Sequence, residues 1–239
     1  MTLTHSSISS LHLLSGGAAQ GLVAQLQTDF ETAKSCSLTG TFGAVGMMQD
    51  RLLTGAPCDV IILTRALIDQ LIVSGQLMPG SDKDLGVVKT GIAVKTGEVP
   101  VDVSTPAQLK AALQAATGIY FPDPVKATAG IHVMNVLKAL GLDTELADRL
   151  RPFPNGASAM KAMAQCAEPG LLGCTQITEI LYIDGVELVA PLPQAFELAT
   201  VYTAAVCSQS TAPELAGELI AKMTHPDTAA LRQTCGFER

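Results

Sequence analysis

Small and hydroxyl-bearing residues stand at several points where an apolar run, expected to be a strand, gives way to a helical pattern. The first such turn is Ser15-Gly16-Gly17, which follows the apolar residues 11–14. Helix N-termini expose unpaired N–H groups, and glycine lets a ligand approach the backbone closely, so these turns predict a site for a small anion. Ser15 and Ser158 could equally be ordinary helix N-caps. The expected ligand contacts at the turns are Ser15, Gly16, Gly17, Ala44, Val45, Thr128, Ala129 and Ser158.

Two cationic side chains fall beside these turns. Arg65 directly follows the apolar residues 60–64, where its guanidinium could form a fork onto a carboxylate. Lys126 lies within the third turn, where its ammonium could pair with a second carboxylate. Such a pair would suit a polycarboxylic acid. The alternatives are a solvated arginine in the first turn of a helix and a surface lysine.

Three titratable residues are candidates for moving a proton: Glu179, His132 and Lys126. A carboxylate whose pKa is raised by burial is suited to take up and return a proton. Glu179 could instead cap a helix or form a salt bridge. His132, one turn into an expected helix, could be a packed core side chain or a surface one.

The composition describes a chain with a large core and few aromatic residues. Of its 239 residues, 48% are hydrophobic, 15% charged and 4% aromatic, which is typical of strands covered by helices on both faces. The net charge is −7 and no basic run occurs, which argues against nucleic acid as a partner. The six cysteines form no C-x-x-C motif and the four histidines are scattered, so we expect reduced cysteines, no metal and no cofactor.

The N-terminal residues do not have the pattern of a secretion signal. They contain no basic segment followed by an apolar stretch, and no apolar run in the chain approaches the length of a membrane-spanning helix. We therefore expect a cytoplasmic protein with no membrane insertion. A periplasmic location would follow if a signal peptide had been removed.

Strand-like and helical segments alternate along the chain, which predicts an α/β fold with mainly parallel sheets. Residues 86–97 read as two short strand halves with no room for a helix between them, and residues 200–207 read as a late return strand. These features predict two lobes. Residues 1–88 plus 194–239 would form lobe 1, and residues 89–193 would form lobe 2.

Several motifs together resemble the periplasmic-type (type II) solute-binding fold, in its molybdate-binding-protein-like branch. They are the turn FGAVG (42–46), GAPCDVIILT (55–64), DPVKATAGIHVMNVLKALGL (123–142) and the terminal MTHPDTAALRQTCGF (223–237). The resemblance implies two α/β lobes, each a mainly parallel sheet flanked by helices. Two crossing strands would join them, with the ligand in the cleft between.

The chain departs from the molybdate binders at two points. Ala44 and Val45 stand where that branch has a second hydroxyl, and Thr175 and Gln176 stand where it has a tyrosine. Each buried donor lost costs about 1–3 kcal/mol, so we expect weak molybdate binding. Thr175 and Gln176 are themselves candidate ligand contacts. The segments 176–180 and 185–193 are similar to a signal-less subgroup that resembles bacterial aconitate isomerases.

Two functions of different classes follow from this resemblance. The first is a cofactor-independent isomerase that moves a proton within a small unsaturated polycarboxylic acid, such as aconitate. The second is a non-catalytic binding protein for an oxyanion or a small carboxylate, acting as a sensor or as the binding component of a molybdate-type ABC transporter. An ABC permease would be a partner only in the second case.

Overall fold

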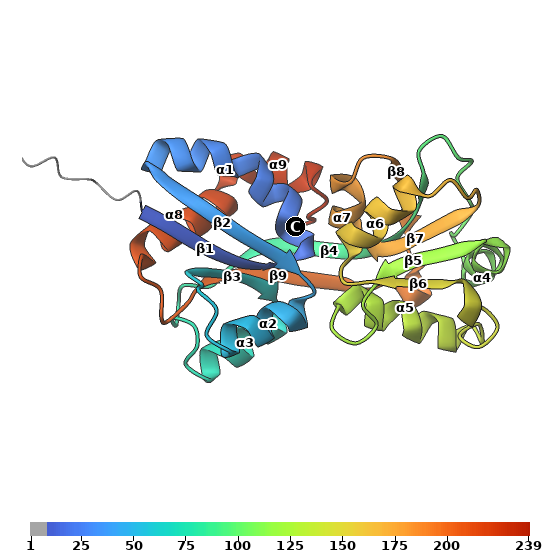
Figure 1. Ribbon diagram of the computed structural model, residues 1–239, viewed down its shortest axis with the longest axis horizontal. Helices are drawn as coiled ribbons and strands as arrows, with labels where there is room; N and C mark the ends of the chain where they lie inside the picture. The colour runs from blue at the N-terminus through green and yellow to red at the C-terminus, as the bar shows by residue number, and fades with distance from the viewer. Residues whose placement is uncertain (1–8) are drawn as a thin grey trace, which may run out of the picture.

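The computed structural model describes residues 9–239 and shows an α/β chain arranged as two lobes along its long axis (Figure 1). The strands form one path, β2-β1-β3-β9-β4-β7-β5-β6, and β8 also pairs with β4. Their bounds are β1 Ser9–Gly16, β2 Cys36–Gly43, β3 Val60–Thr64, β4 Lys83–Lys95, β5 Gly118–Pro122, β6 Leu150–Phe153, β7 Leu171–Gln176, β8 Val186–Pro191 and β9 Ala199–Val206.

In the first lobe, β2, β1 and β3 pair in parallel, and β9 joins β3 antiparallel. Helices cover both faces of this sheet, with α1, α8 and α9 on one side and α2 and α3 on the other (Figure 1). Their bounds are α1 Gln20–Lys34, α2 Val45–Leu53, α3 Arg65–Val73, α8 Pro213–Thr224 and α9 Ala229–Thr234. The short 3-10 helices η1 (Gly17–Ala19) and η4 (Pro226–Thr228) precede α1 and α9.

The second lobe repeats this plan. Strands β6, β5 and β7 pair in parallel, and β4 adds antiparallel to β7. Helices α6 and α7 lie on one side of this sheet, and α5 lies on the other (Figure 1). The helical bounds are α4 Pro106–Ala115, α5 Thr128–Ala139, α6 Gly156–Gln165 and α7 Ile177–Tyr182, with the 3-10 helices η2 Ala147–Arg149 and η3 Gln194–Phe196.

Strand β4 carries the chain from one lobe to the other. Its first half pairs with β9, and its second half, from Thr90 on, pairs with β7 and β8. The return crossing is the segment between β8 and β9, where the Thr90 N–H donates to Leu198 O (3.1 Å) and the Leu192 N–H donates to Thr90 O (3.0 Å). The lobes are therefore joined by two backbone segments that are hydrogen-bonded to each other.

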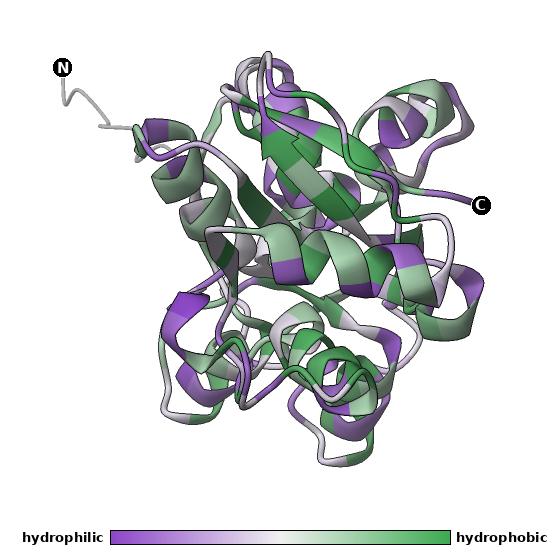
Figure 2. Cartoon of the chain, turned by 90° about the vertical axis from the view of Figure 1, so that its right-hand side faces the viewer, coloured by the Kyte–Doolittle hydropathy of each residue, from purple (hydrophilic) through white to green (hydrophobic). Residues whose placement is uncertain are grey.

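The hydrophobic core is divided in the same way. One cluster draws on residues 11–88 and 202–237, and two further clusters draw on residues 92–192. Figure 2 shows the apolar residues concentrated on the strands, with helices that alternate between apolar and polar positions. This separation supports our proposal that the lobes comprise 1–88 plus 194–239 and 89–193.

The structure corrects three details of the expected elements. Residues 86–97 do not form two strand halves, because β4 is one 13-residue strand that changes partners midway. Strands β6 and β8 were not expected as strands. Each sheet is mixed, since β4 and β9 add antiparallel pairs to the parallel ones. No helix within residues 9–239 is long and apolar enough to cross a membrane.

Candidate functional site

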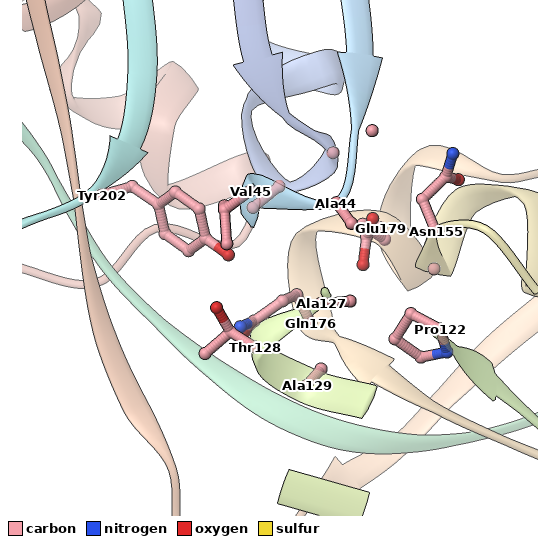
Figure 3. Close-up of a pocket in the computed structure, with 14 residues that line it drawn as sticks. Ala44, Val45, Pro122, Ala127, Thr128, Ala129, Asn155, Gln176, Glu179 and Tyr202 are labelled. Carbon is pink, nitrogen blue, oxygen red and sulfur yellow. The ribbon is translucent and has the colours of Figure 1, made fainter. Parts of the chain in front are cut away.

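A small cavity with about 20 Å³ of free space lies between the two lobes, next to the carboxyl ends of β2, β5 and β7 (Figure 3). That space holds about one water molecule, so the lobes are closed here and a solute can enter only when they separate. The lining residues are Gly17, Ala18, Gly43, Ala44, Val45, Pro122, Ala127, Thr128, Ala129, Asn155, Gly156, Gln176, Glu179 and Tyr202.

The N-termini of three longer helices meet at this cavity. Helices α2 and α5 begin after Ala44 and Ala127, which offer no side-chain cap to the first N–H groups. Helix α6 begins after Asn155, whose side chain accepts one hydrogen bond, from the Ser158 N–H (2.8 Å). Unpaired N–H groups and the positive ends of helix dipoles favour an anion at such a point. None of the described residues that line the cavity is Lys, Arg or His, so the backbone supplies its positive potential.

Glu179 places a carboxylate in the wall of the cavity. Only 5% of the residue is exposed, and its Oε2 accepts a hydrogen bond from Thr175 Oγ1 (2.5 Å). Burial raises the pKa of Glu179, because water no longer solvates the charged form. The Thr175 hydroxyl opposes this rise in pKa, and so do the backbone N–H groups of Ala157, Gly156 and Gln176. The carboxylate thus sits at the N-terminus of α6, where a bound anion would otherwise be held.

Two glycines make room for this carboxylate. A Cβ at Gly17 would collide with Glu179 Oε1, and a Cβ at Gly156 would collide with Glu179 Oε2 and Thr175 Oγ1. Gly17 comes from the first lobe and Gly156 from the second. The glycines therefore allow both lobes to close on one side chain.

Two further polar side chains, those of Gln176 and Tyr202, face the cavity. Gln176 is 3% exposed, and neither its amide nitrogen nor its amide oxygen makes a hydrogen bond among the described residues. The Tyr202 hydroxyl, from β9, points toward Gln176 and Thr128 (Figure 3). Burial and the nearby Glu179 raise the pKa of Tyr202, so the phenol stays protonated and can donate. A buried amide without partners is costly, which makes Gln176 available to a ligand.

The structure brings half of the expected residues to the cavity. Those that line it are Gly17, Ala44, Val45, Thr128, Ala129, Gln176 and Glu179, and Thr175 acts on it through Glu179. Ser15 and Gly16 lie behind the lining, where the buried Ser15 hydroxyl donates to Gly16 O (2.8 Å). The Ser158 side chain is not part of the lining, and its backbone N–H is taken up by the helix cap.

The expected cationic groups lie elsewhere. Arg65 forms ion pairs with Asp82 and Asp69 (both 2.7 Å), so its guanidinium does not face the cavity. Lys126 pairs with Asp50 (2.6 Å) on the opposite lobe, outside the cavity lining.

His132 is likewise outside the cavity, with Nε2 2.8 Å from Phe196 O. Of the three candidates for moving a proton, the structure places only Glu179 at the cavity.

Sequence reasoning missed seven of the lining residues, which are Ala18, Gly43, Pro122, Ala127, Asn155, Gly156 and Tyr202. Tyr202 lies in the expected return strand 200–207, but nothing in that pattern shows that an antiparallel return would bring its phenol between the lobes. Asn155 could have been predicted from the sequence, because Asn-Gly before a helical pattern is a typical N-cap.

Comparisons with known proteins identify a matching family model, a relative in sequence and several similar structures. The family model of bacterial extracellular solute-binding proteins matches residues 11–238. Aconitate isomerase from Pseudomonas sp is 26% identical over 242 aligned positions, which cover 97% of this chain and 88% of that protein. The periplasmic molybdate-binding protein of Azotobacter vinelandii has a similar structure (TM-score 0.80, 19% identity, 96% of this chain and 99% of that chain). A tungstate ABC transporter structure from Geobacter sulfurreducens is also similar (TM-score 0.66, 16% identity, 94% and 97%).

Proposed function

This chain belongs to the family of bacterial extracellular solute-binding proteins, and we propose that its inter-lobe cavity binds a small unsaturated polycarboxylate and moves a proton within it. The substrate would be aconitate-like, and the reaction would be a cofactor-independent isomerisation. The observation that carries this proposal is the Glu179 carboxylate, buried in the wall of a cavity otherwise built for an anion.

An ionised carboxylate in the wall of the site would repel a bound dianion. Two like charges 4 Å apart repel by about 4 kcal/mol at an effective dielectric constant of 20. The raised pKa of Glu179 lets it hold a proton when a negative ligand is near. The site therefore favours a ligand that can exchange a proton with Glu179. The same property suits a general acid and base that works near neutral pH.

The proposed reaction divides the work between backbone and side chains. The unpaired N–H groups at the starts of α2 and α5 hold the substrate carboxylates, whereas the Gly46 N–H of α2 is already bonded to Lys126 O. Glu179 removes a proton from a carbon next to a carboxylate, and the negative charge spreads over the three-carbon unit and onto the carboxylate oxygens. Helix N-termini stabilise that charge. Glu179 then returns the proton at the other end of the three-carbon unit, which moves the double bond and leaves the oxidation state unchanged.

Gln176 and Tyr202 would orient the substrate. The Gln176 amide offers both a donor and an acceptor, and the Tyr202 hydroxyl offers a donor from the other lobe. The similarity to an aconitate isomerase over 97% of the chain supports this choice of substrate class.

The second candidate is a non-catalytic binding protein for a carboxylate or oxyanion, with an ABC permease as its partner. The fold shared with molybdate- and tungstate-related proteins supports it. In that case a protonated Glu179 would be a hydrogen-bond donor to the ligand. The expected cytoplasmic location stays a prediction, and the family's extracellular description favours the periplasmic alternative.

One pair of assays separates the two candidates. Purified wild-type protein, Glu179→Gln and Glu214→Gln are each incubated with trans-aconitate, and the isomers are separated by chromatography. Calorimetry then measures binding of trans-aconitate, cis-aconitate and molybdate. Glu214 is an exposed residue of α8, so its variant controls for the same chemical change far from the cavity.

The isomerase predicts interconversion by the wild type and by Glu214→Gln. It predicts none by Glu179→Gln, although that variant still binds. Tight binding by the wild type without interconversion would leave only the binding protein. Sub-micromolar affinity for molybdate alone would contradict the proposed ligand class.

A further inference from the structure

Two cysteines that are far apart in the sequence touch in the first lobe. Cys207 Sγ lies 3.1 Å from Cys58 Sγ, although the two residues are 149 positions apart. Cys58 is 8% exposed and Cys207 is fully buried. Cys58 precedes β3 and Cys207 follows β9, so the contact joins an early segment of the chain to a late one. It is the only sulfur–sulfur hydrogen bond within residues 9–239.

The backbone around these sulfurs is held in place by Asp59. The Cys207 N–H donates to Asp59 O (2.9 Å). The Asp59 carboxylate accepts hydrogen bonds from the His12 N–H (2.8 Å) and from Ser210 Oγ (2.6 Å). A disulfide needs an S–S distance of about 2.05 Å, so the two sulfurs would have to approach by about 1 Å.

We propose that Cys58 and Cys207 form a disulfide when the chain folds in an oxidising compartment. The two thiols lose two protons and two electrons as the S–S bond forms. A small disulfide oxidant such as oxidised glutathione accepts them and is released as two thiols. This replaces the expectation of fully reduced cysteines for this pair, and the family's extracellular description is consistent with such a compartment.

The timing of bond formation follows from the surroundings of the pair. The contact with Cys58 and burial raise the pKa of Cys207, so folded Cys207 supplies little of the thiolate that attacks a disulfide. The bond therefore forms during folding, before β3 and β9 close over it. Once formed, it resists reduction, because the residues around it exclude reductants.

The expected consequence is stability of the first lobe rather than a change in binding. The disulfide would close a loop that contains the whole second lobe, and cross-links over long loops restrict the unfolded chain most. Cys58 and Cys207 do not line the cavity. Ligand affinity should therefore be the same in the oxidised and reduced proteins.

Fragment mass measurement tests the bond directly. The full chain is unfolded, reduced, and refolded with a mixture of reduced and oxidised glutathione, and free thiols are then alkylated. Combined cleavage after Lys, Arg and Glu places Cys58 on residues 52–65 and Cys207 on residues 198–214, each apart from the other cysteines. Cys166 and Cys174 share residues 162–179, because the Glu168–Pro169 bond resists cleavage. We expect these two fragments to be joined, and the other four cysteines to be alkylated.

Thermal unfolding supplies the second measurement. We expect wild type refolded with a phosphine reductant to unfold at a midpoint about 5–10 °C below that of wild type refolded with the glutathione mixture. The reductant should have no such effect on Cys58→Ala/Cys207→Ala. Alkylation of Cys58 and Cys207 in natively folded protein after oxidative refolding, or a cross-link that uses another cysteine, would overturn the proposal. The fragment measurement on the wild type decides this even if the double variant does not fold.

Discussion

Glu179 shows how one residue can combine burial, hydrogen bonding and proton exchange. Its carboxylate is surrounded by groups from both lobes, and among residues 9–239 the Thr175 hydroxyl is the one side chain that donates a hydrogen bond to it. Burial destabilises the ionised form of Glu179, whereas the surrounding hydrogen-bond donors stabilise it. A group in this balance can change protonation during a reaction cycle without water entering the site.

The raised pKa of Glu179 has a consequence for stability. The folded chain holds this proton more tightly than the unfolded chain does. The stabilisation is therefore complete below the ordinary pKa of 4.5 and is lost as pH rises through the folded-state pKa. We predict that Glu179→Gln removes this loss. The free energy of unfolding of the variant should therefore rise relative to that of the wild type from pH 4.5 upward. The total rise should be about 1.4 kcal/mol for each unit by which the fold elevates the pKa. Urea unfolding from pH 4 to pH 8 measures it. Glu214→Gln should run parallel to wild type, and a parallel curve for Glu179→Gln would contradict the prediction.

The space provided by Gly156 gives a second prediction at this scale. Gly156→Ala would push a methyl group into the Glu179 carboxylate and the Thr175 hydroxyl. We expect it to lower the free energy of unfolding by about 1–3 kcal/mol and to abolish turnover. The matched control is Gly217→Ala in α8, where a Cβ meets nothing within 4 Å. Chemical unfolding and the isomerisation assay compare the two, and wild-type behaviour of Gly156→Ala would show that the carboxylate is not confined there.

At the scale of elements, helices α2 and α5 approach each other across the mouth of the cavity. The Gly46 N–H of α2 donates to Lys126 O (3.1 Å), and Lys126 Nζ pairs with Asp50 of α2 (2.6 Å). Both charged side chains are exposed, and exposed ion pairs contribute at most about 1 kcal/mol. This pair therefore favours closure weakly, and the backbone hydrogen bond adds to it.

We predict that Asp50→Asn and Lys126→Met each weaken ligand affinity by less than about fivefold, and that the double variant is no worse than either. Calorimetry at low and at high salt measures it, and the wild type should approach the variants as salt rises. Loss of turnover in Lys126→Met, with Asp50→Asn still active, would instead make Lys126 part of the chemistry.

The elements differ in how far the sequence could predict them. Helical periodicity and glycine stops predict one helix over 17–33, one from 65 to near Gly75 and one that ends at Gly141, close to the bounds of α1, α3 and α5. Strand β6 is short and contains Pro152, which hides its pairing. Residues 86–97 read as two strand halves, but β4 is one strand whose partners change at Thr90. That change depends on the whole fold, so local sequence does not show it.

The site was predictable to the extent that backbone geometry determines it. Turns before helices identified Thr128 and Gly17, since those residue types report on local conformation. Arg65 could not be placed, because the carboxylate of Asp82 lies 17 positions further along the chain. Tyr202 needed the return of the C-terminal strand, which is a property of the whole fold.

At the scale of the whole molecule, the two lobes and their two connecting segments account for where the cavity lies. Each lobe contributes helix N-termini, and the hydrogen bonds at Thr90 hold the connections together where the lobes meet. Lobes joined in this way can open to admit a solute and close around it. Closure brings Gly17 of one lobe against Glu179 of the other, which excludes water from the carboxylate.

The central claim is that Glu179 moves a proton within a bound unsaturated polycarboxylate. The most direct test is proton NMR of trans-aconitate with the purified protein in deuterated water. We predict conversion to the cis isomer by the wild type. Deuterium should accumulate at the carbon that receives the proton, because Glu179 equilibrates with solvent between turnovers. Glu179→Gln should bind the acid and leave its spectrum unchanged. An unchanged spectrum with wild-type protein that binds the acid tightly would contradict the claim.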